Sequence, residues 1–221
     1  MRFEIRSLTS KDAAAFQVLR LRSLRESPEA FGSSYDEEVS RPLTAVGERL
    51  QAALTPHARV VFGALADGTL IGVVGCAQES RVKTRHKAVI WGMYVTPEAR
   101  GQGVGRALLD RVVAEARRWP NVERILLSAV ERATAARALY ASAGFKPYAR
   151  EVDAFRQSGK SDTLEFFGLE LGDHGDVSGM AIRHLGAAER WGSRVDSRTA
   201  DCRFTPRDHS CDSRLSSSHS S

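Results

Sequence analysis

The sequence predicts an α+β (mixed α/β) fold, in which β-strands and amphipathic helices alternate along one domain. Two apolar runs flank Asp67-Gly68, and this pattern predicts a β-hairpin because both residues tolerate positive φ. The stretch from Val104 to Arg118 instead carries apolar residues at helical spacing. A chain of 221 residues suits one domain, or one domain with an appendage.

The first part of the chain is expected to hold two helices after a short strand. Residues 3–8 alternate as a strand, and Ser10 can cap a helix that runs to about Arg25. Its predicted buried face consists of Ala14, Val18 and Leu21. After a loop-like stretch at 27–35, a second helix is expected over 36–54. Bends in it are expected near Pro42 and Gly47.

The remaining elements are predicted from apolar runs and the residues that interrupt them. Strands are expected at 59–65, 70–78, 88–95 and 124–130, from Phe145 onward, and at 163–171. Helices are expected at 104–118 and 134–143. Gly144 follows the second of these helices and is a suitable C-cap residue.

Composition divides the chain at Gly172. The predicted elements all precede this residue, whereas residues 173–221 are rich in Ser, Arg, Asp and His. Such a segment cannot bury enough apolar surface to offset the entropy lost on ordering. We therefore expect a folded domain at 1–172 and a disordered tail at 173–221.

Charge and apolar content narrow the classes of function. The net charge of +5 is not concentrated in a basic block with interleaved aromatics, as nucleic-acid binding would favour. Attraction of a polyanionic cofactor explains the excess positive charge equally well. No apolar run approaches the ~18 residues that span a membrane. Charged residues near the start do not resemble a signal peptide, so a cytoplasmic location is expected.

The three cysteines do not predict a metal site. Cys76 lies in an apolar run and is expected in the core. Cys202 and Cys211 lie near His209, but their spacing matches no zinc pattern. We therefore expect no bound metal.

A glycine-rich loop, Arg100-Gly101-Gln102-Gly103-Val104-Gly105, joins a predicted strand to a predicted helix. Glycines allow the backbone to approach a ligand closely, and free N–H groups at a helix start attract anions such as a pyrophosphate. The dinucleotide pattern would need Gly or Ala where Arg106 stands, and the Walker A lysine is absent. A tight turn without a ligand is the alternative.

Three patterns occur in order around this loop. Arg100, Gly103 and Gly105 match Arg/Gln-x-x-Gly-x-Gly/Ala. The preceding strand ends in Tyr94-Val95-Thr96-Pro97. Downstream, the matching residues are Ala136, Leu139, Tyr140, Gly144 and Phe145. Over about residues 3–171 the chain thus resembles the GNAT superfamily of N-acetyltransferases, which implies a central, mostly antiparallel twisted sheet flanked by helices.

The resemblance implies acetyl-CoA as the co-substrate and a primary amine as the acceptor, on a small molecule, a protein N-terminus or a lysine. Main-chain groups of the strand would pair with the pantetheine arm and polarise the acyl carbonyl, and the loop would hold the pyrophosphate. The implied cofactor-binding residues are Met93, Tyr94, Val95, Arg100, Gly101, Gln102, Gly103, Val104, Gly105, Arg106 and Ala136. Tyr140 resembles the tyrosine proposed to protonate the departing thiolate, and the alternative is an aromatic residue that only packs its helix.

The acceptor side is less defined. Transfer needs a neutral amine. Since pH 7 is ~3.4 units below the pKa of a lysine-like amine, removing its proton costs about 4.6 kcal/mol. Candidate bases are Glu37, Glu38 and Glu79, each of which suits a solvated face equally well. Trp91, which alternates with Met93, lines either the acceptor pocket or the core. The stretch 27–35 resembles a loop that covers the acceptor site.

One departure from the family pattern keeps other functions open. Ala133 stands where an asparagine usually helps to hold the cofactor arm, so that contact is absent or is made by Thr134. The alternatives are a non-catalytic coenzyme A-binding module and an acyltransferase that uses another acyl-CoA. Homodimers are common among similar proteins, so a homodimer is a further expectation.

Overall fold

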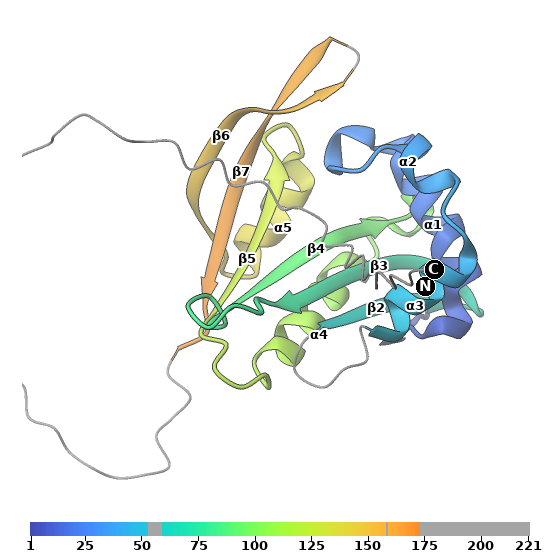
Figure 1. The fold of residues 1–221 in the computed structure, drawn as a ribbon, viewed down its shortest axis with the longest axis horizontal. Helices are drawn as coiled ribbons and strands as arrows, with labels where there is room; N and C mark the ends of the chain where they lie inside the picture. Colours follow the sequence, from blue (N-terminus) through green and yellow to red (C-terminus); the bar gives the residue numbers. More distant parts are fainter. Residues whose placement is uncertain (53–58, 158, 173–221) are drawn as a thin grey trace, which may run out of the picture. The chain divides into compact units, whose positions relative to one another are not determined.

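Across residues 1–52, 59–157 and 159–172, which the computed structural model describes, seven strands form one sheet in the order β1-β2-β3-β4-β5-β7-β6 (Figure 1). The strands are β1 (Glu4–Ser7), β2 (Arg59–Ala66), β3 (Thr69–Gln78), β4 (Lys87–Val95), β5 (Arg124–Val130), β6 (Lys146–Gln157) and β7 (Lys160–Glu170). Within this sheet only β4 and β5 are parallel. The predicted mostly antiparallel sheet is therefore confirmed, whereas the tail at 173–221 lies outside the described residues.

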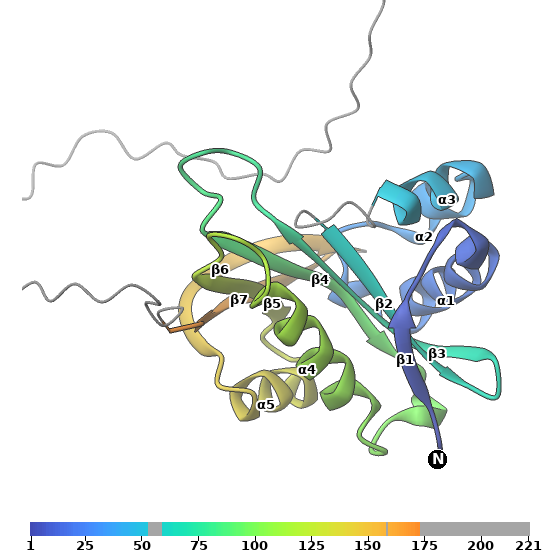
Figure 2. The same ribbon diagram turned by 90° about the horizontal axis from the view of Figure 1, so that it is seen from below.

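Helices cover both faces of the sheet. They are η1 (Ser10–Asp12), α1 (Ala13–Glu26), η2 (Pro28–Ala30), α2 (Tyr35–Val39), α3 (Leu43–Ala52), η3 (Pro97–Ala99), α4 (Val104–Ala116) and α5 (Thr134–Ser142). Figure 2 shows α4 and α5 on one face and α1, α2 and α3 on the other. A buried apolar cluster lies on each side, so the sheet is the middle layer of three.

The start of the first helix differs from the prediction. Thr9, rather than Ser10, is the capping residue, and its side chain accepts a hydrogen bond from the N–H of Lys11 at 3.3 Å. The predicted bend near Pro42 is a full break, because α2 ends at Val39 and α3 begins at Leu43. Proline lacks the N–H that a continuous helix would need at this point.

The predicted buried face of α1 was also wrong. Val18 is 70% exposed and Ala14 is exposed, whereas Gln17 is buried. The amide Nε2 of Gln17 donates a hydrogen bond to the main-chain carbonyl of Glu38 at 2.6 Å. Because this bond satisfies the buried amide donor, the polar Gln17 can occupy the inner face of α1. The inner face therefore does not coincide with the predicted apolar face.

The parallel pair β4–β5 separates after three residues. Lys87 to Val89 pair with Arg124 to Leu126, and over the described residues the ladder ends there. Beyond that point β4 stays with β3, and β5 stays with β7. The facing main-chain edges of Ile90–Val95 and Leu127–Val130 therefore lack a strand partner in the middle of the sheet.

A β-bulge bends β4 where the strands separate. Tyr94 pairs with Val73 and Trp91 pairs with Gly75, so β4 carries one extra residue between these two pairs. Gly92 lies within the bulge and has φ of 63°, a conformation that favours glycine. The bulge turns the rest of β4 away from β5.

Two predicted helices, α4 and α5, are confirmed. The inner stripe of α4 is confirmed, because its residues are fully or almost fully buried: Val104, Leu108, Leu109, Val112 and Ala116. Gly144 follows α5 with φ of 89°, as predicted for a C-cap. No helix in the described part of the chain is both long and apolar enough to cross a membrane.

Candidate active site

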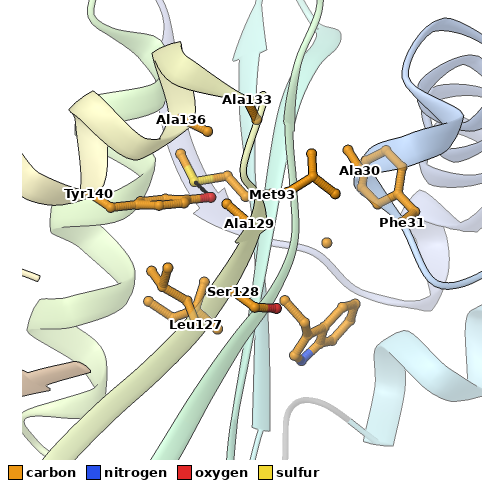
Figure 3. A pocket seen from close by; sticks show the side chains of 13 residues that line it. Ala30, Phe31, Met93, Leu127, Ser128, Ala129, Ala133, Ala136 and Tyr140 are labelled. Atoms are coloured by element: carbon orange, nitrogen blue, oxygen red, sulfur yellow. Dashed lines mark hydrogen bonds between the residues drawn. The ribbon is translucent and has the colours of Figure 1, made fainter. Parts of the chain in front are cut away.

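A pocket fills the gap between β4 and β5, with ≈ 490 Å³ of empty space that includes its open mouth. It is lined by Ala30 and Phe31, by residues 90–93 of β4, by residues 127–130 of β5, and by Ala133, Ala136 and Tyr140 (Figure 3). Three predicted site residues, Met93, Ala136 and Tyr140, thus meet in one place.

The bulge at Gly92 places the side chains of Trp91 and Met93 on opposite faces of the sheet. Regular alternation would place Trp91 and Met93 on the same face. Instead, Met93 packs with the cluster under α4 and α5, and Trp91 packs with the cluster under α1 and α3. Trp91 does line the pocket, but from the face opposite Met93. The pocket therefore passes through the sheet.

Tyr140 is the one titratable side chain among the described residues that line the pocket. Its hydroxyl points at Met93, with the oxygen 3.8 Å from the sulfur (Figure 3). Burial raises its pKa to about 12, so the phenol is neutral near pH 7. A thioether sulfur is a weak acceptor, and this buried donor would bond more strongly to a negatively charged atom.

The glycine loop forms the N-terminus of α4 and presents main-chain N–H groups. Gly101 and Gly103 have φ of 73° and 82°, which glycine adopts without strain. Ala107 is the first residue whose N–H bonds back to the loop, to the carbonyl of Gly103 at 3.0 Å. The N–H groups of Val104, Gly105 and Arg106 thus precede the helical ladder, and helix N-termini of this kind are suited to bind anions.

Side chains of the loop fix its position rather than fill it. Arg100 Nε donates to the carbonyl of Val95 at 3.0 Å, and Gln102 Nε2 donates to the carbonyl of Glu98 at 2.8 Å. Arg106 Nε bonds Asp110 at 2.8 Å. The loop is therefore tied to β4, η3 and α4, while its main chain stays open.

Tyr94, a predicted cofactor-binding residue, is not among the residues that line the pocket. The side chain lies on the α1 face, is buried, and donates a hydrogen bond to the carboxylate of Glu26. Burial, followed by this partner, raises the pKa of Tyr94 to about 12. Arg22 bonds Glu26 at 2.8 Å and Glu98 at 2.5 Å, which joins α1 to η3.

The three predicted bases lie outside the pocket lining. Glu37 caps α2, where its Oε2 accepts the N–H of Ser34 at 2.6 Å. Glu38 is buried against the guanidinium of Arg41, whose Nε donates at 2.9 Å. Glu79 follows β3 and accepts from the hydroxyl of Thr84 at 3.4 Å. Each carboxylate has a structural partner.

Ala133 occupies the N-cap position of α5 and lines the pocket, where its methyl group cannot form a hydrogen bond. The sequence reasoning had not singled out the β5 wall at 127–130 or Gly92. A glycine inside an apolar strand is a signal for a bulge and could have identified the second. The β5 wall reads only as a buried strand, so local sequence carries no signal for it.

The described residues contain no group of three or more His, Cys, Asp or Glu side chains placed to hold a metal ion. Cys202, Cys211 and His209, whose spacing predicted no zinc site, lie outside the described residues. Cys76 is buried, as predicted, and desolvation raises the pKa of its thiol.

Comparison with known proteins links this site to a family. The model of the acetyltransferase (GNAT) family matches residues 21–145. A GNAT-family acetyltransferase from Streptococcus pneumoniae superposes with a TM-score of 0.71 at 20% identity, covering 77% of this chain and 100% of that one. A ribosomal-protein-alanine N-acetyltransferase from Brucella melitensis superposes with a TM-score of 0.67 at 23% identity, covering 76% of this chain and 99% of that one.

A third similar structure contains a cofactor. It is a putative acetyltransferase from Salmonella typhimurium with its cofactor acetyl-CoA, with a TM-score of 0.64 at 23% identity, covering 80% of this chain and 98% of that one. At these identities the structural likeness shows a shared fold.

Proposed function

Because this chain belongs to the acetyltransferase (GNAT) family, we infer that it is an acetyl-CoA-dependent N-acetyltransferase whose acceptor is a primary amine of low pKa. The observation that carries this proposal is the pocket between β4 and β5, which side chains line from both faces of the sheet. Such a channel allows the thioester to enter from the α5 face and the amine from the α1 face.

The donor side accommodates coenzyme A through main-chain groups. In this proposal the pantetheine arm lies along the free edge of β4 at Met93–Val95, where β5 no longer pairs. The pyrophosphate lies at the start of α4, against the N–H groups of Val104, Gly105 and Arg106. Ala136 leaves room for the arm beside α5.

The reaction follows from this placement. The neutral amine attacks the thioester carbonyl carbon, a C–N bond forms, and a main-chain N–H of the bulged part of β4 stabilises the developing oxyanion. The C–S bond then breaks, and Tyr140 donates its hydroxyl proton to the departing sulfur. The proton lost by the amine passes through water and restores the phenol.

The pKa of Tyr140 bears on that step. A phenol of pKa about 12 is a weaker acid than a thiol, whose ordinary pKa is about 8.5. The same apolar surroundings also raise the pKa of a thiol formed beside Tyr140, so the two values approach each other. Tyr140 thus hydrogen-bonds the sulfur as its charge develops.

The acceptor class follows from the pocket lining. It contains no carboxylate and no histidine among the described residues, so water must carry the proton away from the ammonium. A lysine-like amine costs about 4.6 kcal/mol to deprotonate at pH 7, but an α-amine of pKa about 7.7–8.0 costs only about 1 kcal/mol. An α-amine is therefore the favoured acceptor. The proposal retains the cytoplasmic location and the homodimer expected from the sequence.

Thiol release by the full-length protein tests the proposal. At pH 7, α-amines of short peptides and small molecules should give at least about tenfold higher kcat/KM than the ε-amine of an Nα-blocked lysine. Faster turnover of the ε-amine would contradict the acceptor class. A rise in Tm with acetyl-CoA but no thiol release with any amine would instead support the non-catalytic coenzyme A-binding module.

A further inference from the structure

The acceptor half of the pocket is the part that faces α1 and α3, and it is lined by the rings of Phe31 and Trp91. An arginine guanidinium packs against each ring. Arg20 Cζ lies 4.7 Å from the ring centroid of Phe31, and Arg59 Cζ lies 4.9 Å from that of Trp91. Both rings line the pocket. Positive charge therefore flanks the acceptor half from α1 and from β2, while no acidic side chain of the described residues lines it.

Glu38, the carboxylate that acts electrostatically on Arg20, is already engaged by other arginines. Glu38 accepts from Arg41 Nε at 2.9 Å, and Arg49 Nη1 lies 3.9 Å from its other oxygen. Two other guanidiniums therefore engage this carboxylate directly, and it acts on Arg20 only through space. Burial lowers the pKa of Arg20, the Glu38 carboxylate opposes this shift, and weaker repulsion from Arg49 and then Arg41 adds to it. The guanidinium is desolvated and short of negative charge.

We propose that Arg20 is a specificity-determining residue, which binds an anionic group carried by the acceptor amine. The group is a carboxylate or a phosphonate, and both offer the oxygen pair that a planar guanidinium binds with two parallel hydrogen bonds. Such a ligand would supply the counter-charge that the surroundings of Arg20 lack. This inference rests on the proposed function and narrows its substrate to small amino acids and their close analogues.

The same contact would assist deprotonation. A free carboxylate next to an ammonium stabilises the charged amine and raises its pKa. Pairing that carboxylate with Arg20 cancels this effect and places a positive charge near the ammonium, which lowers its pKa. Anion binding would thus partly replace the base that the pocket lining does not contain.

Matched acceptors provide the experiment. Each set consists of an amino acid, its aminophosphonate analogue, its carboxamide and the amine without the acidic group, in small, aliphatic and aromatic versions. We expect the wild-type protein to prefer the anionic members by at least about tenfold in kcat/KM, because charge-assisted hydrogen bonds are the stronger class. Whichever anion gives the lower KM identifies the natural group.

Variants of Arg20 separate a specificity role from a structural one. Arg20→Gln should raise KM at least about tenfold for anionic acceptors, while KM for the carboxamide and for acetyl-CoA stays within about twofold. Arg20→Lys should recover part of the loss, because it keeps the charge but not the planar fork. The control is Arg118→Gln, a change at an exposed arginine just after α4 and outside the pocket.

Several results would overturn the inference. Equal kcat/KM of the wild-type protein for carboxylate and carboxamide would do so without any variant, as would an equal effect of Arg20→Gln on every acceptor. Either result leaves the proposed function intact provided that amines are acetylated. Failure to acetylate any amine would remove the proposed function, and the inference with it.

Discussion

The two halves of the pocket are built in different ways. On the α4 and α5 face, the donor half consists of main-chain N–H groups at the start of α4, a free strand edge and small residues such as Ala136. On the α1 face, the acceptor half consists of aromatic and arginine side chains brought together from α1, the loop after η2, β2 and β4. In the proposed function, main-chain groups bind the donor, so side-chain substitutions should affect donor binding less than they affect the choice of acceptor.

The largest expected effect is the loss of turnover on substitution of Tyr140, which should leave cofactor binding by the donor half unchanged. Tyr140→Phe should lower kcat about 100-fold, since it removes the proton donor to sulfur. The Kd for acetyl-CoA should change less than about twofold, because the backbone contacts remain. Single-turnover kinetics with calorimetric titration measure both. Tyr148→Phe, on the outside of β6, is the control; unchanged kcat in Tyr140→Phe would exclude the acid role.

The two buried tyrosines, one on each face, predict a loss of stability at high pH. Tyr140 and Tyr94 both have pKa values raised to about 12, so the folded protein favours their neutral forms. Their stabilising contribution is complete below the unfolded pKa of about 10 and is lost as pH rises toward 12.

Denaturant unfolding between pH 9 and pH 12 measures this effect. For Tyr140, which burial alone perturbs, the loss approaches about 2.7 kcal/mol. Tyr140→Phe should make the pH dependence of the free energy of unfolding shallower by up to about 1.4 kcal/mol per pH unit. A slope identical to that of the wild type would contradict the neutral, buried phenol.

A matched pair of glycines tests the backbone character of the donor half. Gly103 and Gly68 have φ of 82° and 77°, and at both positions an added Cβ would meet open space. Each substitution by alanine should cost about 1–2 kcal/mol of stability through backbone strain. Only Gly103→Ala should also weaken acetyl-CoA binding, by roughly tenfold, because it distorts the N–H groups at the start of α4. Equal affinities in the two variants would contradict the anion site.

The smallest expected effect concerns Ala133. Ala133→Asn adds a side chain that suits the N-cap of α5 and can reach into the pocket. One net hydrogen bond of about 0.5–1.5 kcal/mol predicts a roughly two- to tenfold lower Kd for acetyl-CoA. A higher Tm without tighter binding would mean that the residue serves only the helix.

The sequence predicted the helices and turns around the glycine loop well because their determinants are local. The glycine loop, the break at Pro97, the inner stripe of α4 and the C-cap at Gly144 each depend on residues close together in the chain. The acceptor half depends on contacts between distant segments, such as Arg20 with Phe31. No local pattern predicts such a pair.

The errors have the same origin. The buried face of α1 was misplaced because Gln17 is satisfied by a carbonyl of α2, which a helical pattern cannot reveal. Trp91 and Met93 were taken as alternating residues of a regular strand, but one extra residue at Gly92 places them on opposite faces. Glu38 was a candidate base, yet arginines from neighbouring segments engage its carboxylate.

A crystal structure of the full-length protein with coenzyme A tests the division into donor and acceptor halves most directly. The pyrophosphate is predicted at the N–H groups of Val104–Arg106, and the sulfur between β4 and β5, within hydrogen-bonding distance of Tyr140 Oη. Coenzyme A bound on the α1 face, or with its sulfur outside the gap between the strands, would contradict this assignment.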